Sequence, residues 1–333
     1  MKVGVHDLIV RSKGKSNEET FNDTKKLVKY LDEIGYEKYW FAEHHGMENV
    51  LSSAPEILVS YFAAITENIS LGTGGTMIMH YSPLKIAETF KTLAELAPGR
   101  VDIGLGRAPG GSFREIVALS DGNYDQNQDL YHKMDVILDY LKDKIPDDSL
   151  YSITKAVPMN NEKLVEPWML GSTGNSARAA SMMGLGYSFA KFFSMETPTE
   201  IFKKYKNEFR PSEFFEKPEL SVSYKILVTE TKEELEYLEK SFDYFNIQQR
   251  RGDYSGIIDP EELKNYQFSE AERNFLDEGY RKRYAIKGTK DEVRAILEEE
   301  IEKLGTDMIF AFTPLYSVED RMKSYKLLKE ILE

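Results

Sequence analysis

Two adjacent histidines, His44 and His45, follow a short apolar run at residues 39–42. Such a run is typical of a parallel strand covered on both faces, and ligands of α/β proteins bind beyond the carboxyl ends of these strands. Because neighbouring strand residues point to opposite sides, we expect one of the pair to face the site, where it could act as a general base. Both could instead cap the strand end. His6 and His80 also fall at predicted strand ends, so a metal site is a weaker alternative.

Glycines interrupt the third predicted strand near its end, at Gly72, Gly74 and Gly75. Glycine inside a strand marks a bulge or a close approach by a ligand. A Gly-Gly pair at the rim would let backbone amides touch a flat ring system. The alternative is a simple bulge that helps a barrel to curve.

Two further segments suit a phosphate group. Arg107 follows the predicted strand at 101–106, and its guanidinium group combines a fixed positive charge with several hydrogen-bond donors. An arginine after a strand is, however, more often part of a surface ion pair. The other segment is a small polar loop that opens a helix: Gly171, Ser172, Thr173, Gly174, Asn175 and Ser176. Free amides and the positive end of the helix dipole point at such a loop. It is neither a Walker loop nor the three-glycine dinucleotide fingerprint, and similar turns cap helices without a ligand.

Strand and helix patterns alternate along the chain and predict a parallel α/β sheet with crossover helices. The predicted strands cover residues 3–10, 39–42, 69–79, 101–106, 167–170, 187–193, 220–229 and 307–312. The predicted helices between them cover residues 17–34, 54–67, 82–96, 175–183, 198–209, 232–245, 289–304 and 318–332. Eight such units close a (β/α)8 TIM barrel in roughly 250 residues, so we expect a single domain over residues 1–333 with insertions.

The two predicted insertions lie at about 108–157 and 250–284. The first is expected to hold a helix at 125–143 and an extra strand at 151–157. The second is polar and rich in turn residues, which favours a lid over the site.

The composition limits the classes of function. The chain of 333 residues carries a formal net charge of −13, which argues against binding to nucleic acid or to anionic membranes. It contains no cysteine, which excludes disulfides and thiolate catalysis and fits a cytoplasmic protein. No signal peptide and no membrane span is expected from its apolar pattern.

Taken in order, these motifs resemble the bacterial luciferase-like family of flavin-dependent monooxygenases. The matching segments are residues 42–45, the glycine-interrupted third strand, 104–107, 171–176 and the turn at 288–293. The resemblance covers essentially the whole chain. It implies a (β/α)8 barrel, use of reduced FMN supplied by a separate flavin reductase, and O2 as the oxidant of a small organic substrate. It also implies a homodimer paired through the second and third helices.

The resemblance also suggests roles for individual residues. His44 matches the family's catalytic histidine. Thr73, Gly74 and Gly75 match the third-strand segment that lies on the isoalloxazine ring, where the glycine pair is often joined by a non-proline cis peptide. Arg107 matches an arginine that contacts the phosphate, and the loop from Gly171 to Ser176 matches the phosphate loop. Luciferase has a cysteine at the position of Gly106, so light emission with a long-chain aldehyde is not expected.

Three alternatives remain open from the sequence. A deazaflavin-dependent dehydrogenase of the same superfamily would share the fold and most of these motifs. A flavin-binding protein without turnover would keep the phosphate loop. A metal-dependent barrel hydrolase would need a set of carboxylates and histidines that the sequence does not supply in any obvious spacing.

Overall fold

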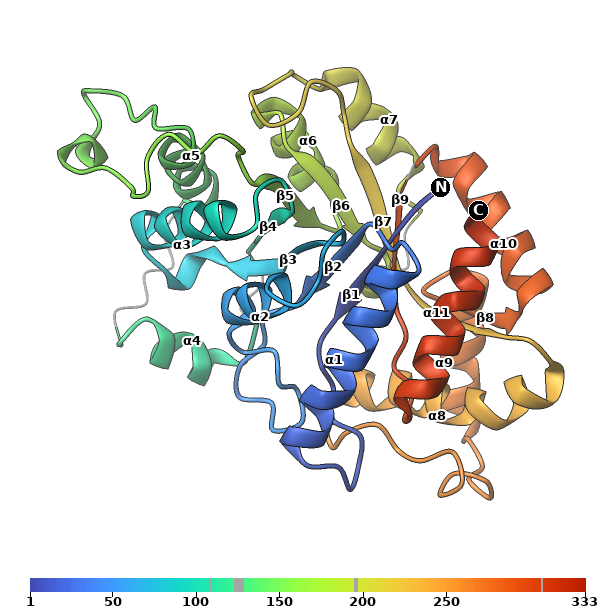
Figure 1. Cartoon of the computed structure of the whole chain (residues 1–333). Coiled ribbons are helices and arrows are strands. Elements are labelled where there is room, and N and C mark those ends of the chain that lie inside the picture. Colours follow the sequence, from blue (N-terminus) through green and yellow to red (C-terminus); the bar gives the residue numbers. More distant parts are fainter. Residues whose placement is uncertain (108–109, 123–128, 195–196, 307) are drawn as a thin grey trace.

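The computed structural model describes residues 1–107, 110–122, 129–194, 197–306 and 308–333 (Figure 1). Its strands are β1 (Lys2–Asp7), β2 (Lys38–Phe41), β3 (Ser70–Met77), β4 (Val101–Gly106), β5 (Glu166–Gly171), β6 (Gly186–Ala190), β7 (Leu220–Thr229), β8 (Ala285–Thr289) and β9 (Met308–Phe312). Parallel pairing runs in sequence order from β1 to β7, then through β9 back to β1. The predicted eight-stranded (β/α)8 TIM barrel is therefore confirmed.

Helices surround the barrel. They are α1 (Asn17–Glu33), α2 (Pro55–Ala63), α3 (Pro83–Leu96), α4 (Phe113–Leu119), α5 (Leu130–Leu141), α6 (Gly174–Met183), α7 (Thr199–Glu208), α8 (Lys232–Arg251), α9 (Glu270–Arg281), α10 (Lys290–Leu304) and α11 (Val318–Leu332). Three short 3₁₀ helices join them: η1 (Ile78–His80), η2 (Leu150–Ile153) and η3 (Lys191–Phe193). None of the helices in the described ranges is long and apolar enough to cross a membrane.

Local signals in the sequence set several of these boundaries. Ser16 and Glu19 form a capping box at the start of α1, in which each side chain bonds to the other residue's backbone amide. Pro55 and Pro83 stand at the first positions of α2 and α3, where a missing amide costs no hydrogen bond. The predicted bounds of β4, β7 and α11 agree with the structure.

The structure adds a ninth strand that the sequence prediction lacks. β7 has 10 residues; its first part lies in the barrel, and its last part pairs with β8 outside the barrel closure. The predicted helix at 289–304 begins one residue later, at Lys290, because Thr289 ends β8 and caps α10. Gly288 and Thr289 thus belong to a strand as well as to the turn into a helix.

The first insertion also differs from its prediction. The expected strand at 151–157 is wrong: residues 150–153 form η2, and the chain that follows has no strand partner. The expected helix at 125–143 is present as α5 from Leu130, whereas residues 125–128 lie outside the described residues. Asp307, the predicted start of the last strand, also lies outside them.

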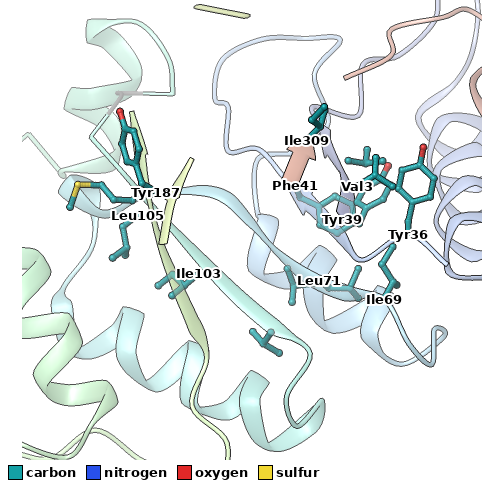
Figure 2. Close-up of a cluster of buried hydrophobic side chains, with 14 of the residues drawn as sticks. Val3, Tyr36, Tyr39, Phe41, Ile69, Leu71, Ile103, Leu105, Tyr187 and Ile309 are labelled. Atoms are coloured by element: carbon teal, nitrogen blue, oxygen red, sulfur yellow. The ribbon is translucent and has the colours of Figure 1, made fainter. Parts of the chain in front are cut away.

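Alternation along the strands separates two cores. Outward-facing side chains such as Val3, Tyr39 and Leu71 pack beneath the helices (Figure 2). Inside the barrel, Trp40 stacks on Phe310 with ring centroids 4.1 Å apart. The aromatic interior fills the centre of the barrel, so it is a packed core and not a pore.

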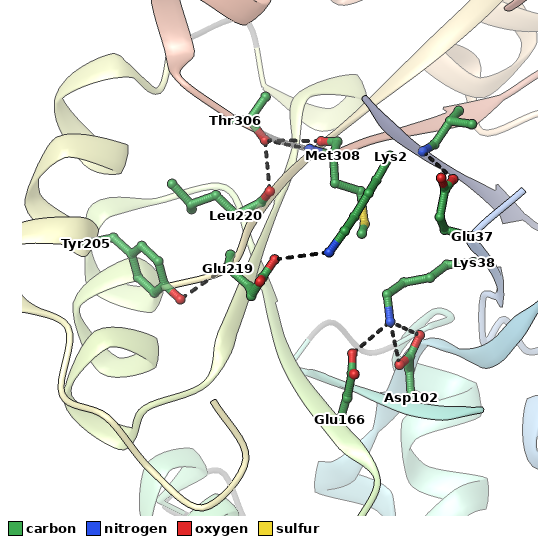
Figure 3. Close-up of polar contacts among 11 residues, drawn as sticks. Lys2, Glu37, Lys38, Asp102, Glu166, Tyr205, Glu219, Leu220, Thr306 and Met308 are labelled. Carbon is green, nitrogen blue, oxygen red and sulfur yellow. Dashed lines mark hydrogen bonds and ion pairs between the residues drawn. The ribbon is translucent and has the colours of Figure 1, made fainter. Parts of the chain in front are cut away.

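An ion-pair cluster closes the amino ends of the strands. Lys38 Nζ lies 2.8 Å from Asp102 Oδ1 and 2.8 Å from Glu166 Oε2 (Figure 3). Trp40 Nε1 donates to the same Asp102 carboxylate at 2.7 Å, which ties the cluster to the aromatic interior. This cluster occupies the end of the barrel opposite the carboxyl ends of the strands.

Candidate active site at the carboxyl ends of the strands

A cavity of about 470 Å³ opens at the carboxyl ends of the barrel strands. Its floor comes from the strands themselves and includes Trp40, Gly74, Gly75 and Ser223. Its walls come from the segments after the strands and from α5. Almost all of the sequence-predicted site residues meet here: His44, Gly74, Gly75, Arg107, Gly171, Ser172, Thr173, Asn175 and Ser176. This volume lies within the range of sites for small molecules and cofactors.

The two histidines after β2 point in different directions, as the strand alternation predicts. His44 lines the cavity. His45 Nε2 instead pairs with Glu43 Oε1 at 2.9 Å. The buried Glu43 carboxylate also accepts hydrogen bonds from the Met77 amide at 2.8 Å and from the Tyr81 hydroxyl at 2.6 Å. Glu43 therefore joins the rim of β2 to the rim of β3 and fixes the position from which His44 enters the cavity.

His44 is a neutral imidazole near pH 7. Burial, with added repulsion from His6 and His45, lowers the pKa of His44 to about 4. Its Nδ1 atom is buried and has no hydrogen-bond partner among the described residues. A buried polar atom without a partner is costly.

The glycines of β3 allow the backbones of β3 and β4 to approach closely. Gly74 and Gly75 are joined by a cis peptide, as the resemblance implies. A Cβ atom on Gly75 would lie 2.7 Å from the Gly104 carbonyl oxygen, and one on Gly104 would collide with the Thr73 carbonyl oxygen. The β3–β4 register also shifts between Thr73 and Thr76, so the segment is both a bulge and a flat floor.

His6 is a site residue that the sequence analysis noted only as a strand-end histidine. It lines the cavity, and its Nε2 atom bonds to the Gly74 carbonyl oxygen. A Cβ atom on Gly74 would lie 2.6 Å from that nitrogen, so the imidazole rests directly against the glycine. Burial lowers the pKa of His6, which keeps this ring neutral as well. The contact joins residues 68 positions apart, and no local pattern reveals it.

The opposite end of the cavity is formed by the start of α6. Thr173 is the N-cap residue, but its side chain makes no capping hydrogen bond. The first amides of α6 are therefore left without the usual side-chain acceptor, which is the arrangement that anions occupy. Ser176 Oγ donates to the Thr173 carbonyl at 2.9 Å, and the Tyr187 hydroxyl donates to the same carbonyl at 3.1 Å. These bonds hold the loop open toward the cavity.

Arg107 completes this polar end. It is exposed at the end of β4, lines the cavity, and makes no ion pair with another described residue. The described residues therefore give no support to the alternative that Arg107 forms a surface ion pair. Gly171 is needed because a Cβ there would collide with Ser176 Oγ. Gly174 begins α6 and contributes its amide, although its own atoms do not line the cavity.

Thr73 is a correction to the predicted site. It is fully buried and does not line the cavity. Its hydroxyl shares a hydrogen bond of 2.9 Å with Thr76 Oγ1 and accepts one of 3.2 Å from the Gly104 amide. Its side chain stabilises the β3–β4 bulge and is not available to a cofactor in the cavity.

The predicted lid at 250–284 is also corrected, because no residue of this segment lines the cavity. Ile257 pairs by backbone hydrogen bonds with the β1–α1 loop, and α9 packs beside β8. The walls come instead from α5, through Leu130, Tyr131 and Met134, and from Phe192 and Phe193 of η3. Aliphatic and aromatic residues on α5 gave no signal that distinguished them from an ordinary helix face.

Metal ligation has no support within the described ranges. They contain no group of three histidine, aspartate or glutamate side chains placed to hold a metal ion. His45 and His80 are near each other, with ring centroids 6.5 Å apart, but His45 already pairs with Glu43.

Comparisons with known proteins give matches along most of the chain. The family model for luciferase-like monooxygenases matches residues 1–308. A luciferase-like monooxygenase of Escherichia coli K12 is 30% identical over 327 residues, covering 98% of this chain and 96% of its own. An N-acetyl-S-alkylcysteine monooxygenase of Bacillus subtilis is 30% identical over 338 residues, covering 99% and 98%.

Solved structures agree with the fold. The apo form of MsnO8 superposes with a TM-score of 0.86 at 27% identity and covers 99% of this chain and 98% of its own. The oxygenating constituent of 3,6-diketocamphane monooxygenase from Pseudomonas putida, in complex with FMN, superposes with a TM-score of 0.71 at 18% identity, covering 100% and 97%. An F420-dependent secondary alcohol dehydrogenase also reaches 0.71, at 15% identity, covering 100% and 99%. At these last two identities the likeness concerns the fold alone.

Proposed function

The chain belongs to the luciferase-like monooxygenase family and is a flavin-dependent monooxygenase, and from that premise we propose that its flavin is FMN. In this proposal the enzyme binds reduced FMN in the barrel-mouth cavity and uses it with O2 to oxygenate a small organic substrate. The supporting observation is that one cavity joins a glycine floor to an arginine without an ion-pair partner among the described residues and to a helix start without a side-chain cap.

The two ends of the cavity fit the two ends of FMN. The cation of Arg107 and the first amides of α6 suit a phosphate dianion, because both are donors and neither has a partner within the described residues. The floor at Gly74 and Gly75 suits a planar ring, since these two lining residues present backbone and carry no side chain of their own. The neutral imidazole of His44 lines the same cavity.

Bound reduced flavin supplies the two electrons with which O2 is activated, so that one oxygen atom enters the substrate and the other leaves as water. The chain itself binds, orients and protects. His44, neutral near pH 7, accepts and returns a proton at its imidazole, which lines the cavity. His6 fixes the Gly74 carbonyl, and Glu43 fixes the β2 and β3 rims. The apolar walls from α5 and η3 exclude water, which would divert the oxidant to peroxide.

The phosphate contact can be tested with FMN and riboflavin, which differ only in the phosphate. We expect Arg107→Ala to weaken FMN binding by about 10- to 100-fold, because it removes one charge-assisted hydrogen-bond contact to the phosphate. Riboflavin binding should be unchanged. Arg294→Ala on α10, whose arginine lies outside the cavity, is the matched control. Flavin fluorescence titration measures all six affinities, those of wild type and of the two variants for each ligand. Equal losses for both ligands, or no loss, would contradict the proposed orientation.

A deazaflavin-dependent dehydrogenase is the second candidate, and the F420-dependent neighbour of the same fold is the observation that favours it. Titration of the protein with FMN and with the deazaflavin cofactor distinguishes them. Under our proposal FMN binds more tightly and anaerobically reduced FMN in the protein consumes O2 when air is admitted. Preference for the deazaflavin would transfer the assignment to the dehydrogenase.

We also propose partners for the enzyme. Reduced FMN comes from a separate reductase in the cytoplasm, as the resemblance to the luciferase-like family implies. Two copies pair through α2 and α3. Ile57, Tyr61 and Leu96 support this, because they are 64%, 50% and 67% exposed around one groove between these helices. Light scattering of wild type and Ile57→Glu tests the pairing; a monomeric wild type would contradict it.

A further inference from the structure

The side chains around the cavity are depleted in charge relative to the rest of the molecule. Charged residues make up 30% of the chain, yet among the 26 described residues that line the cavity Arg107 is the sole member of the Asp, Glu, Lys and Arg set. The molecule as a whole has a net charge of −13. The scarcity of charged residues is therefore a property of this cavity and does not follow from the composition of the whole chain.

The single guanidinium is already committed under the proposed function. It lies at the polar end of the cavity beside the start of α6, where the phosphate of the cofactor would bind. A phosphate dianion there uses the whole fork of donors, so no fixed cation remains for an acidic substrate. The segments outside the described residues add no cation, since positions 108–109, 123–128, 195–196 and 307 contain no lysine or arginine.

Nearby lysines are also occupied elsewhere. Lys133 precedes Met134 on α5, but its ammonium donates to the Met79 carbonyl at 3.3 Å and does not line the cavity. Lys191 of η3 is 1% exposed and donates to the Ser194 carbonyl at 3.1 Å. Neither ammonium is placed to pair with a carboxylate in the cavity.

The remaining walls are apolar and adaptable. Beyond the polar end and the glycine floor, the cavity is bounded by Leu8, Met77, Leu130, Met134, Phe192 and Phe193. Methionine side chains adjust to irregular shapes and contact aromatic rings and thioethers favourably. His44 is the ionisable histidine on this side, and it is neutral near pH 7.

From this lining we infer that the substrate is an uncharged, predominantly apolar small molecule, and that the cavity rejects carboxylate and ammonium forms of the same skeleton. The inference rests on the proposed function, because the FMN phosphate is what occupies Arg107. It sets the chain apart from the similar N-acetyl-S-alkylcysteine monooxygenase, whose named substrate carries a carboxylate. An ion without a partner in such a cavity would lose its hydration and gain no counter-charge.

Three probes that share one skeleton test the inference on the FMN-loaded protein. They are methyl (phenylthio)acetate, the free (phenylthio)acetate anion and the 2-(phenylthio)ethylammonium cation. Calorimetry and the change in the flavin absorption spectrum report binding without turnover. We expect the ester to bind at least about tenfold more tightly than either ion. Comparable affinities of the three probes, or binding of none of them while FMN is bound, would overturn the inference.

A substitution at the rim provides a gain-of-function arm. Phe193 is 69% exposed and lines the cavity, so Phe193→Arg adds a cation there with little risk to folding. The variant should reduce the ratio of ester affinity to carboxylate affinity by several-fold and increase the ratio of ester affinity to ammonium affinity. Tyr237→Arg on α8, where the tyrosine is 46% exposed and outside the cavity, adds the same charge as a control and should leave both ratios unchanged. Equal shifts in the two variants would contradict the inference.

The design separates this inference from the function on which it rests. Failure of the wild-type protein to bind FMN would overturn the proposed function. Binding of FMN together with tight binding of the carboxylate probe would leave the proposed function in place and overturn the substrate class alone.

Discussion

The two halves of the barrel mouth are built from the same kind of strand ends but are finished differently. Beyond β2 to β6 the mouth is open and forms the cavity. Beyond β9 and β1 it is filled by an apolar plug, which we define as Val10, Val50, Phe245, Ile257 and Phe312, with Leu8 and Ala42 on its border. Leu8 and Ala42 also line the cavity, so the border of the apolar plug forms one wall of the cavity.

The difference shows what the second insertion does. Backbone hydrogen bonds join Ile257 to Arg11 and Lys13, and Arg11 in turn to Asn49, so three loops are tied together over the closed half. The segment at 250–284 therefore supports the cavity from the side. The open half is bounded by α5 and η3. The backbone hydrogen bonds that join the three loops do not involve these two helices.

The largest effect should come from opening the filled half. Phe245 is 4% exposed, and its ring centroid lies 5.8 Å from that of Phe312. Phe245→Ala should lower the free energy of unfolding by about 3–5 kcal/mol, since it leaves a cavity in a packed cluster. Phe193→Ala, in the open half, should cost less than about 0.5 kcal/mol because the ring is largely exposed. Denaturant unfolding measures both, and similar losses would break the comparison.

A second effect of about 3 kcal/mol should appear in the pH dependence of stability. His44 has a pKa of about 4 in the folded chain, below the ordinary histidine value of 6.5. Between these values the unfolded chain binds the proton and the folded chain does not, so stability falls as pH drops from 6.5 to 4 and levels off below that.

Removal of the imidazole should remove this part of the pH dependence. The unfolding free energy of His44→Gln should therefore vary less with pH than that of wild type in the same window. His132→Gln, which replaces an exposed histidine of α5, should follow wild type. Parallel curves for wild type and His44→Gln would show that His44 is not buried as described.

A smaller effect is expected at the glycine floor of the open half. Gly75→Ala places a Cβ 2.7 Å from the Gly104 carbonyl oxygen and from Leu170 Cδ1. It should lower the free energy of unfolding by about 1–3 kcal/mol and should also weaken flavin binding. Gly106→Ala meets its neighbours at 3.7 and 3.9 Å and should be nearly neutral. Thermal unfolding and FMN titration of the two variants test this. If both alanines were tolerated equally, the close approach of β3 and β4 would be disproved.

The smallest effect should separate the polar end of the cavity from its floor. Tyr187→Phe removes the hydroxyl that donates to the Thr173 carbonyl at 3.1 Å and should cost about 1 kcal/mol or less. FMN affinity should fall a few-fold and riboflavin affinity should not change, because only the phosphate loop is loosened. A fall for riboflavin as well would indicate that Tyr187 supports the ring site.

Much of the barrel could be predicted from the sequence, because parallel strands and amphipathic helices have local signals. The glycines at 74 and 75 and the small loop at 171–176 indicated the floor and the polar end for the same reason. The errors occurred where the local signal and the tertiary context disagree. Residues 151–157 alternate like a strand but find no neighbour to pair with, whereas β8 has a turn-like Gly-Thr end yet pairs with β7.

The missed site residues depend on contacts between distant parts of the chain. His6 is recognised only through its bond to Gly74, and Thr73 is excluded only by its bonds to Thr76 and Gly104. The apolar residues of α5 look like any core-facing set until the cavity is seen. Turn-rich composition at 250–284 could not show that Ile257 and Tyr284 are anchored in packed clusters.

The close approach of β3 and β4 has a consequence for how the enzyme could change its chemistry. Backbone atoms fill the space at Gly75 and Gly104, which leaves almost no sequence freedom there. The side chains of Leu130, Met134 and Phe193 stand on separate elements that can vary without disturbing those strands. Retargeting to new compounds is thus a matter of a few replaceable side chains on a scaffold that stays constant, and libraries confined to α5 and η3 should yield altered preferences while cofactor binding survives.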